Sequence, residues 1–150
     1  MIKRLLSILT LSVLLMMVNP AHAVFIGTGN GDLYNLNVST NTSVLIGNSG
    51  TMFDIALDPT SGLLYGLSGS GFSLSLINTT NAAPTFIGGT GSGLNGLTFD
   101  SAGTLYASGG NSLFTVNLGS GAASLIGNTG YTSSGDIAFD SSGNLFMSAI

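Results

Sequence analysis

The feature that most constrains this sequence is a repeat of about 40 residues that runs through most of its length. The pair Ile-Gly begins at Ile46, Ile87 and Ile126, at spacings of 41 and 39 residues. Three further anchors recur with nearly the same period: an aspartate, a leucine followed by Tyr or Phe, and a leucine 13 residues before each Ile-Gly (Asp58, Asp100, Asp140; Leu64, Leu105, Leu145; Leu33, Leu74, Leu113). Four anchors that share one period indicate a chain built from repeated supersecondary units.

Each unit contains four short segments of alternating apolar and polar residues, separated by turn residues, which is typical of β-strands. We label the four positions A, B, C and D, and from residue 32 they follow the order CD, ABCD, ABCD, AB. The expected strands are A at 53–58, 96–100 and 136–140; B at 63–67, 104–108 and 144–148; C at 32–38, 73–78 and 112–118; and D at 43–47, 84–88 and 123–127. Val24–Ile26 resembles a further B strand, and no helical period follows residue 23. The sequence therefore predicts an all-β chain.

The A and B segments are joined by short turns that begin with Asp and end with Gly, at 58–62, 100–103 and 140–143. Aspartate can accept hydrogen bonds from the amides that follow it, and glycine supplies the positive φ that such turns need. Tight turns at fixed places in a four-strand unit of about 40 residues are typical of a propeller blade. We expect a β-propeller-like fold of about three four-stranded blades, with repeat phases near 32–72, 73–111 and 112–150.

The motifs Leu-Tyr-x-Leu-Asn, Leu-Ile-Gly-Asn-x-Gly and Asp-Ile-Ala-Phe-Asp-x-x-Gly, seen at 33–37, 125–130 and 136–143, carry a family resemblance. The pattern resembles the repeat of secreted bacterial β-propellers of the NHL-like kind, which often occur in exported proteins with a PEP-CTERM sorting tail. The resemblance covers nearly all of residues 24–150 and implies the architecture, while propellers host many unrelated activities. The sequence contains no Pro-Glu-Pro motif, so the resemblance does not extend to surface sorting by such a tail.

Three blades are fewer than the four to eight of most propellers, and several explanations stay open. The chain is part of a longer propeller protein, which is the leading expectation. Alternatively, the AB strands of one copy meet the CD strands of another, so that a homodimer forms a six-bladed ring. An open half-ring is the third alternative.

Residues 1–23 have the pattern of a removable secretory signal peptide. Lys3 and Arg4 provide the positive start, an apolar run follows from Leu5 to Val18, and Ala21-His22-Ala23 is a small-x-small cleavage site. The apolar run is shorter than the roughly 20 residues that span a membrane. We expect cleavage after Ala23 and a processed chain, 24–150, without a membrane span, exported by a bacterium to the periplasm, the cell surface or the medium.

Removal of the leader also removes both basic residues and the only histidine. Residues 24–150 then carry six aspartates and no Lys, Arg, His, Cys, Glu or Trp. This composition excludes Ser-His-Asp and Cys-His nucleophilic centres, metal sites made of thiolate or imidazole, and disulfides. It also leaves no cation to neutralise phosphate, so we expect no nucleic-acid partner.

The strongest candidate site lies at the start of the A strands. Asp54, Asn95 and Asp136 stand at near-equivalent positions, where a propeller would place them around one mouth of its channel. Carboxylate and amide oxygens suit a hard cation such as Ca²⁺. The alternative is that these side chains bind the backbone of the loop that leads into strand A. Tyr131, in the longest D-to-A connection, is a candidate ligand contact outside the repeat.

Three functions are compatible with these features. The leading expectation is a non-enzymatic exported propeller module without a cofactor, which binds a protein or glycan partner, because nearly every catalytic side chain is absent. The second is a fragment of a divalent-cation-dependent, lactonase-like hydrolase that uses the Asp54, Asn95 and Asp136 set. The third is a surface or matrix protein that self-associates through open sheet edges.

Overall fold

The computed structural model describes residues 24–150, which form thirteen strands and confirm the predicted all-β class. The strands are β1 (Val24–Gly27), β2 (Asp32–Asn37), β3 (Thr42–Asn48), β4 (Asp54–Leu57), β5 (Leu64–Ser68), β6 (Ser73–Ile77), β7 (Pro84–Gly89), β8 (Gly96–Phe99), β9 (Leu105–Gly109), β10 (Ser112–Val116), β11 (Ala123–Asn128), β12 (Ser133–Phe139) and β13 (Leu145–Ala149). The predicted signal peptide lies outside the described residues. Among those residues, no helix is long and apolar enough to cross a membrane.

The strands form four antiparallel sheets in which chain neighbours pair with each other. Their orders are β1-β2-β3, β4-β5-β6-β7, β8-β9-β10-β11 and β12-β13. The two complete sheets hold the strands predicted as A, B, C and D, and β1 is the further B strand. Each predicted repeat phase therefore takes its C and D strands from one sheet and its A and B strands from the next.

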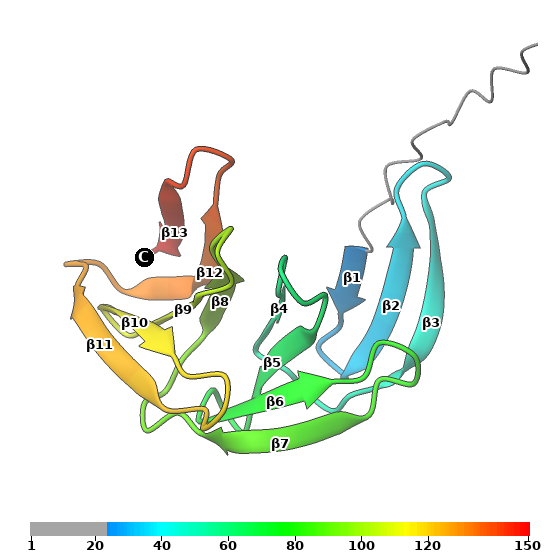
Figure 1. Cartoon of the computed structure of the whole chain (residues 1–150), viewed down its shortest axis with the longest axis horizontal. Coiled ribbons are helices and arrows are strands. Elements are labelled where there is room, and N and C mark those ends of the chain that lie inside the picture. Colours follow the sequence, from blue (N-terminus) through cyan, green and yellow to red (C-terminus); the bar gives the residue numbers. More distant parts are fainter. Residues whose placement is uncertain (1–23) are drawn as a thin grey trace, which may run out of the picture.

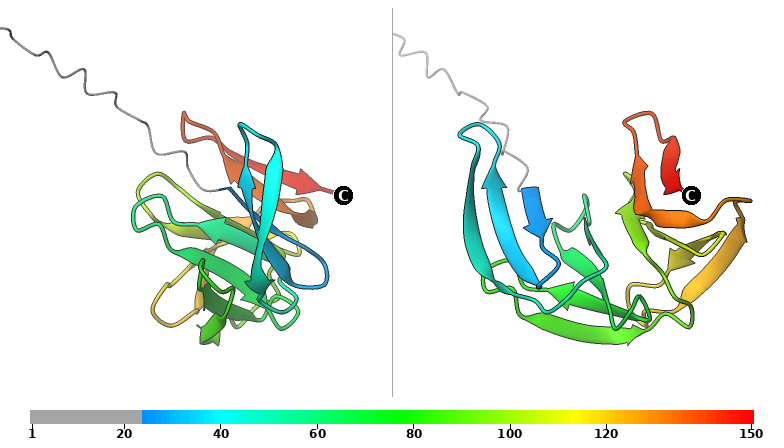
Figure 2. Two further views of the ribbon diagram at one scale, coloured as in Figure 1. Left: turned by 90° about the vertical axis from the view of Figure 1, so that its right-hand side faces the viewer. Right: turned by 180° about the vertical axis from the view of Figure 1, so that it is seen from behind.

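The sheets are arranged side by side along an arc that is open on one side, as in a β-propeller that has not closed (Figure 1). The first strand of each complete sheet lies toward the hollow of the arc, and the fourth lies on its outer side. The views in Figure 2 show that the first sheet and the β12-β13 pair form the two ends, one on each side of the opening. This is the predicted propeller-like fold.

The A-to-B turns have the predicted chemistry. An Asp58 carboxylate oxygen accepts a hydrogen bond from the amide of Thr60 at 2.8 Å, and Asp100 accepts one from Ala102 at 3.0 Å. Gly62 and Gly103 close these two turns at φ values of 72° and 84°. The third turn repeats the arrangement, so the aspartates hold the turns and need no bound ion for that role.

The Ile-Gly anchors mark a β-bulge that recurs between each C strand and its D strand. In the first sheet Leu33 pairs with Gly47 and Tyr34 pairs with Leu45, so Ile46 is the extra residue. The same shift leaves Ile87 and Ile126 unpaired in the second and third sheets. The constant 13-residue spacing in the sequence is therefore the length of one C–D hairpin measured to its bulge.

The apolar core lies between neighbouring sheets. One cluster joins the first and second sheets and includes Leu33, Leu64, Ile77 and Ala82, with Phe25 and Leu57 packed against it. A larger cluster joins the second and third sheets and contains buried leucines together with Tyr65 and Phe99. The large apolar residues of the first two A strands, Ile55 and Leu57 in β4 and Leu97 and Phe99 in β8, contribute to these clusters and so join each blade to the next.

Candidate functional site

Asp54 is the first residue of β4 and is half-buried. Its Oδ2 accepts a hydrogen bond from the amide of Leu97 at 2.6 Å, and its Oδ1 accepts one from the amide of Ile55 at 2.8 Å. Since Leu97 belongs to β8, the carboxylate links the inner strands of two neighbouring sheets. The two amides fix the orientation of the carboxylate at the end of its strand.

Asn95 immediately precedes β8 and links it to the next inner strand. Its Nδ2 donates a hydrogen bond to the carbonyl oxygen of Ser133, at the start of β12, at 3.0 Å. Its own amide donates to the carbonyl oxygen of Ser108 at 2.8 Å. Its Oδ1 is buried and has no hydrogen-bond partner in the protein. Leaving a buried acceptor unpaired costs about 1–3 kcal/mol, so this oxygen is suited to a ligand that the protein itself does not provide.

Asp136 lies on the third inner strand and is exposed to solvent. The sequence predicted that it opens its strand at residue 136, and β12 begins three residues earlier, at Ser133. Ser133 is drawn into the strand because its hydroxyl hydrogen-bonds that of Ser108 at 2.8 Å and because its amide donates to the carbonyl oxygen of Gly110 at 2.7 Å. Asp136 therefore lies within β12.

The electrostatics of the site centre on Asp54. Burial raises the pKa of its carboxyl group to about 6, against the opposing effect of the hydrogen bonds from Leu97 and Ile55. The negative charge of Asp136 contributes further to the rise. Residues 24–150 contain no basic side chain that could balance the two charges. A cation placed near Asp54 would therefore be attracted by both carboxylates.

A cavity of about 300 Å³ lies against Asp54. It is bounded by the β1–β2 turn on one side and by the start of β4 on the other, and it is lined by Gly27, Thr28, Gly29, Met52, Phe53, Asp54 and Ile55. Sequence reasoning did not identify Thr28 or Phe53, because they become neighbours only when the first and second sheets pack. The one signal available was the run Gly27-Thr28-Gly29, which has little side-chain volume to fill the space.

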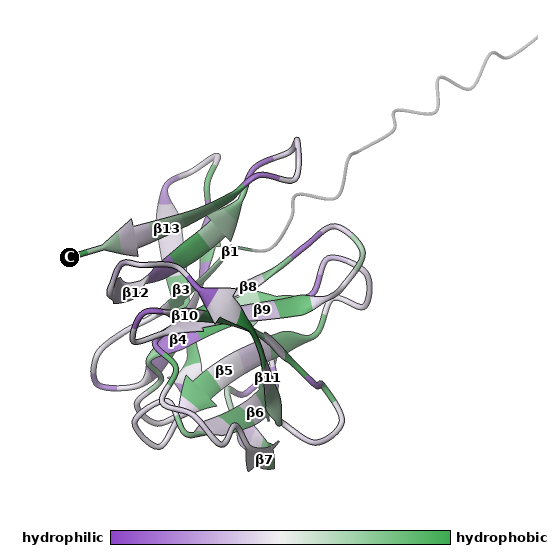
Figure 3. Ribbon diagram, turned by 90° about the vertical axis from the view of Figure 1, so that its left-hand side faces the viewer, coloured by the Kyte–Doolittle hydropathy of each residue, from purple (hydrophilic) through white to green (hydrophobic). Residues whose placement is uncertain are grey.

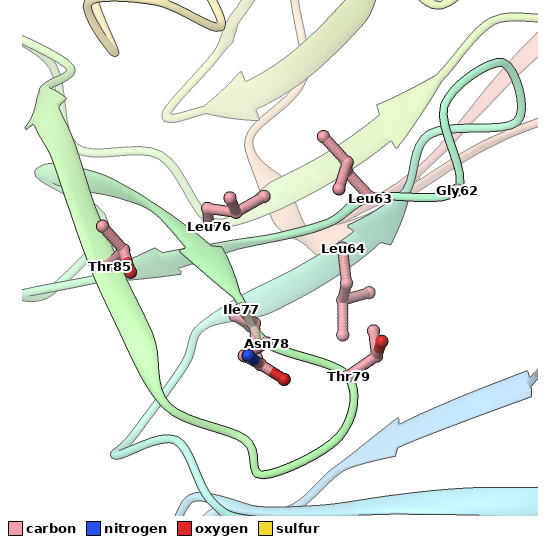
Figure 4. A pocket seen from close by; sticks show the side chains of 8 residues that line it. All are labelled: Gly62, Leu63, Leu64, Leu76, Ile77, Asn78, Thr79 and Thr85. Atoms are coloured by element: carbon pink, nitrogen blue, oxygen red, sulfur yellow. The ribbon is translucent and has the colours of Figure 1, made fainter.

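Two other cavities lie apart from Asp54, Asn95 and Asp136. One of about 270 Å³ lies among residues of β5, β6 and β7 and the turns beside them, and leucine and isoleucine side chains form much of its wall (Figure 4). Its polar side chains are Asn78, Thr79 and Thr85. The other, of about 330 Å³, lies between the turns of Asp100 and Asp140. Both aspartates already accept amide hydrogen bonds from their own turns.

The structure thus places Asp54 in the inner strand β4, Asn95 immediately before the inner strand β8, and Asp136 in the inner strand β12. No hydrogen bond joins their side chains to one another within residues 24–150, and two of them bind the backbone of the neighbouring sheet. In the same residues there is no group of three or more His, Cys, Asp or Glu side chains that could hold a metal ion. The candidate set is therefore two carboxylates and one amide.

Tyr131 lies in the loop between β11 and β12, with 68% of its surface exposed. Its backbone is held by Thr129, whose Oγ1 donates to the carbonyl oxygen of Tyr131 at 2.8 Å. It does not line the cavity beside Asp54. Its ring is available to solvent at the surface.

Comparison with known proteins relates the chain to others through its fold. No protein-family model matches it, and no curated protein does. Among solved structures it is similar to a gluconolactonase from Xanthomonas campestris, with a TM-score of 0.60 and 18% identity over 79% of this chain and 41% of that one. It is also similar to a protein of unknown function from Bacteroides thetaiotaomicron, with a TM-score of 0.63 and 19% identity over 85% of this chain and 40% of that one. The chain spans about two fifths of the length of these structures, and at such identities the likeness shows the propeller-like fold alone.

Proposed function

We propose that this chain supplies part of the active site of a divalent-cation-dependent, lactonase-like hydrolase. Asp54, Asn95 and Asp136 are the proposed cation ligands. The observation that carries the proposal is the Oδ1 atom of Asn95, a buried oxygen without a partner. It belongs to the residue two positions before Leu97, whose amide binds the Asp54 carboxylate.

The donor set fits a hard cation. Ca²⁺ takes six to eight oxygen ligands, including carboxylates, amide carbonyls and water. Asp54 keeps further lone pairs beside the two that accept amide hydrogens, and the Asn95 oxygen is free of any competing donor. Two carboxylates and one amide leave several coordination positions for water and for a substrate oxygen.

The cavity beside Asp54 is the proposed place for the substrate. A volume of about 300 Å³ accommodates a small cyclic ester. The side chains of Met52, Phe53 and Ile55 provide apolar walls. Thr28 lines the opposite side, where its hydroxyl is hydrogen-bonded within its own turn to Asn30 and Asp32. When bound, a divalent cation polarises an ester carbonyl and lowers the pKa of a bound water. The fold shared with the gluconolactonase supports this reaction class.

Calorimetric titration of the protein with CaCl₂, followed by a lactone hydrolysis assay, tests the proposal. We expect saturable Ca²⁺ binding, and hydrolysis of gluconolactone that EDTA abolishes and added Ca²⁺ restores. Asp54→Ala should abolish both. Asp100→Ala is the matched control, because Asp100 is a turn aspartate that does not line the cavity. A wild-type protein that takes up no Ca²⁺ at millimolar concentration and hydrolyses no lactone with Ca²⁺, Mg²⁺, Mn²⁺ or Zn²⁺ would rule the proposal out.

A second candidate is an exported, non-enzymatic binding module of the NHL-like kind. The observation in its favour is that Asp54 and Asn95 both bind the backbone of the next sheet, which is a structural role. Under this function Asp54→Ala lowers the melting temperature, while Ca²⁺ leaves the melting temperature of the wild-type protein unchanged. Export itself is tested by N-terminal sequencing of the secreted or periplasmic protein, which should begin at Val24.

A further inference from the structure

Neighbouring sheets are joined by a contact that occurs twice within the chain. The C–D turn of the second sheet packs on the Ile-Gly bulge of the first, where a methyl group added at Gly47 would meet Asn81 and the side chain of Ala82. The C–D turn of the third sheet packs in the same way on Gly88, through Ser120 and Gly121. Ala82 is completely buried by this contact. The glycine of each Ile-Gly pair is therefore a seat for the turn of the following sheet.

The third such seat is empty in the single chain. Nothing lies within 4 Å of a methyl group placed on Gly127. The preceding Ile126 is 53% exposed, whereas its counterparts Ile46 and Ile87 pack against the two core clusters. Figure 3 views this end of the arc and shows apolar segments on both β11 and β13.

One C–D turn also lacks a seat, namely residues 37–42 between β2 and β3. It has the same build as the two seated turns: the side-chain oxygen of Asn37 accepts the amide hydrogen of Ser39, two residues later, as those of Asn78 and Asn117 accept the amides of Thr80 and Gly119. Asn41 has a φ of 51°, close to the 61° of Ala82. This turn is exposed, and Val38 at its start is 65% accessible.

The aromatic residues of the B strands repeat this pattern: three of them pack between neighbouring sheets, and the last one is exposed. Tyr65 packs on Phe99 of the next sheet with ring centroids 5.5 Å apart, and Tyr106 packs on Phe139 at 5.1 Å. Phe25 occupies the equivalent position in the first cluster. Phe146, the last of the series, is 60% exposed. Its strand, β13, pairs with β12 alone.

We propose that a second copy of this chain covers these surfaces by reciprocal exchange. The β2–β3 hairpin of each copy docks beside β13 of the other, with its 37–42 turn seated on Gly127. In each shared blade β12 and β13 provide strands A and B, and β2 and β3 provide C and D. Phe146 enters the core cluster in place of Phe25. Two complete sheets from each copy and two shared ones give a six-bladed ring with two-fold symmetry.

A second copy fits these surfaces because the uncovered Gly127 bulge and the exposed 37–42 turn are the two sides of a contact that the chain already makes twice. The docking hairpin carries one charged side chain, Asp32 at the start of β2, and residues 112–128 and 145–150 carry none, so no two charged side chains meet in this contact. The exchange replaces the pairing of β1, a four-residue edge strand, by that of β13, which has five residues. β1 is displaced from β2 in the ring, and β13 of the other copy takes its place beside the start of β4, where Gly27 lines the cavity in the single chain.

Disulfide trapping tests the contact directly, because the described residues contain no cysteine and the whole sequence has none. In the ring β13 takes the place of β1 beside β2, so Met147 stands where Ile26 now pairs with Tyr34. Directly opposite residues of antiparallel strands have Cβ atoms about 4.5–5.5 Å apart, close enough for oxidative crosslinking of two cysteines. We expect oxidised Tyr34→Cys/Met147→Cys protein to become a covalent dimer that dithiothreitol reverses. The control pair Phe114→Cys/Met147→Cys should stay uncrosslinked, because Phe114 belongs to β10, which already pairs on both sides with β9 and β11.

Light scattering on two phenylalanine variants gives an independent readout. The wild-type protein should be a dimer, Phe146→Asp a folded monomer, and Phe25→Ala still a dimer, since β1 has no role in the ring. A monomeric wild-type protein, crosslinking of both cysteine pairs alike, or fibres that grow without closing would each overturn the exchange. Neither phenylalanine is a proposed cation ligand or lines the cavity beside Asp54. Ca²⁺ titration of the monomeric Phe146→Asp variant therefore distinguishes failure of the dimer from failure of the proposed cation site.

Discussion

A side chain at Gly88 would occupy the space taken by the carbonyl oxygen of Ser120 in the next sheet. The same close approach exists between Gly47 and the backbone of Asn81. The most regular motif in the sequence is therefore a requirement for contact between blades, since only glycine leaves room for the incoming turn.

Gly88→Ala should destabilise the protein by about 1–3 kcal/mol, the range for forcing an extra carbon into a closely packed position. Gly119→Ala is the control, because the nearest atom to an added methyl group there, Oδ1 of Asn117, lies 3.5 Å away. Urea denaturation followed by circular dichroism measures both. Equal stabilities for the two variants would show that the turn moves aside freely.

Phe99→Ala should cost about 3–5 kcal/mol, the range for truncating a buried aromatic residue. Phe99 is buried and packs on Tyr65 across the boundary between the second and third sheets. Phe86→Ala removes the same side chain from the outer strand β7, where it is exposed, and should change the stability by less than about 0.5 kcal/mol. Thermal melting of the two variants distinguishes a core between the sheets from sheets that are stable independently.

Asp58→Ala should destabilise the protein more than Asp100→Ala. The buried Asp58 carboxylate accepts hydrogen bonds from the Thr60 hydroxyl and amide and from the Ser61 hydroxyl, and donors left unpaired cost about 1–3 kcal/mol. Although burial by itself raises the pKa of Asp58, these hydrogen bonds outweigh it and hold the pKa below its ordinary value.

The depressed pKa of Asp58 gives this prediction a pH dependence. The carboxylate contributes its full stabilisation above the pKa of the unfolded chain, near 4, and loses it as the pH falls through the lower folded pKa. The stability difference between the wild-type protein and Asp58→Ala should therefore be constant from pH 7 to about 5 and shrink below about 4. A difference that grows on acidification would contradict the assignment.

Asn95→Asp should raise the affinity for Ca²⁺ about fivefold or more, because a unit charge about 4 Å from a cation contributes about 1 kcal/mol even in water. Asn111→Asp adds the same charge at an exposed position and should leave the affinity nearly unchanged. Titration calorimetry compares the two. Equal gains would indicate a general effect of net charge.

Much of the fold could be predicted from the sequence because it depends on local chemistry. The alternation of apolar and polar residues locates the strands, and the Asp and Gly residues locate the turns at residues 58–62 and 100–103. The predicted boundaries were least accurate for β12, which is extended by hydrogen bonds from Ser133 to Ser108 and Gly110 in the neighbouring sheet. Such contacts depend on how two sheets pack, and no local pattern encodes them.

The candidate site likewise combines features that the sequence predicts with features that depend on how the sheets pack. The residue types of Asp54, Asn95 and Asp136, and their placement on or directly beside successive inner strands, follow from the repeat. The hydrogen bond from Leu97 to Asp54 and the unpaired oxygen of Asn95 depend on the relative positions of β4, β8 and β12. The cavity lined by Thr28 and Phe53 also arises only when the first sheet packs on the second.

A crystal structure of the protein grown or soaked with CaCl₂ tests the proposed cation site most directly. The expected result is a cation at 2.3–2.6 Å, the usual Ca²⁺–oxygen range, from Oδ1 of Asn95 and from the Asp54 carboxylate. The contrary result is a water molecule on the Asn95 oxygen, with Asp54 bound only to the amides of Leu97 and Ile55. That outcome would make both residues structural links between blades and would remove the basis for a cation-dependent hydrolase.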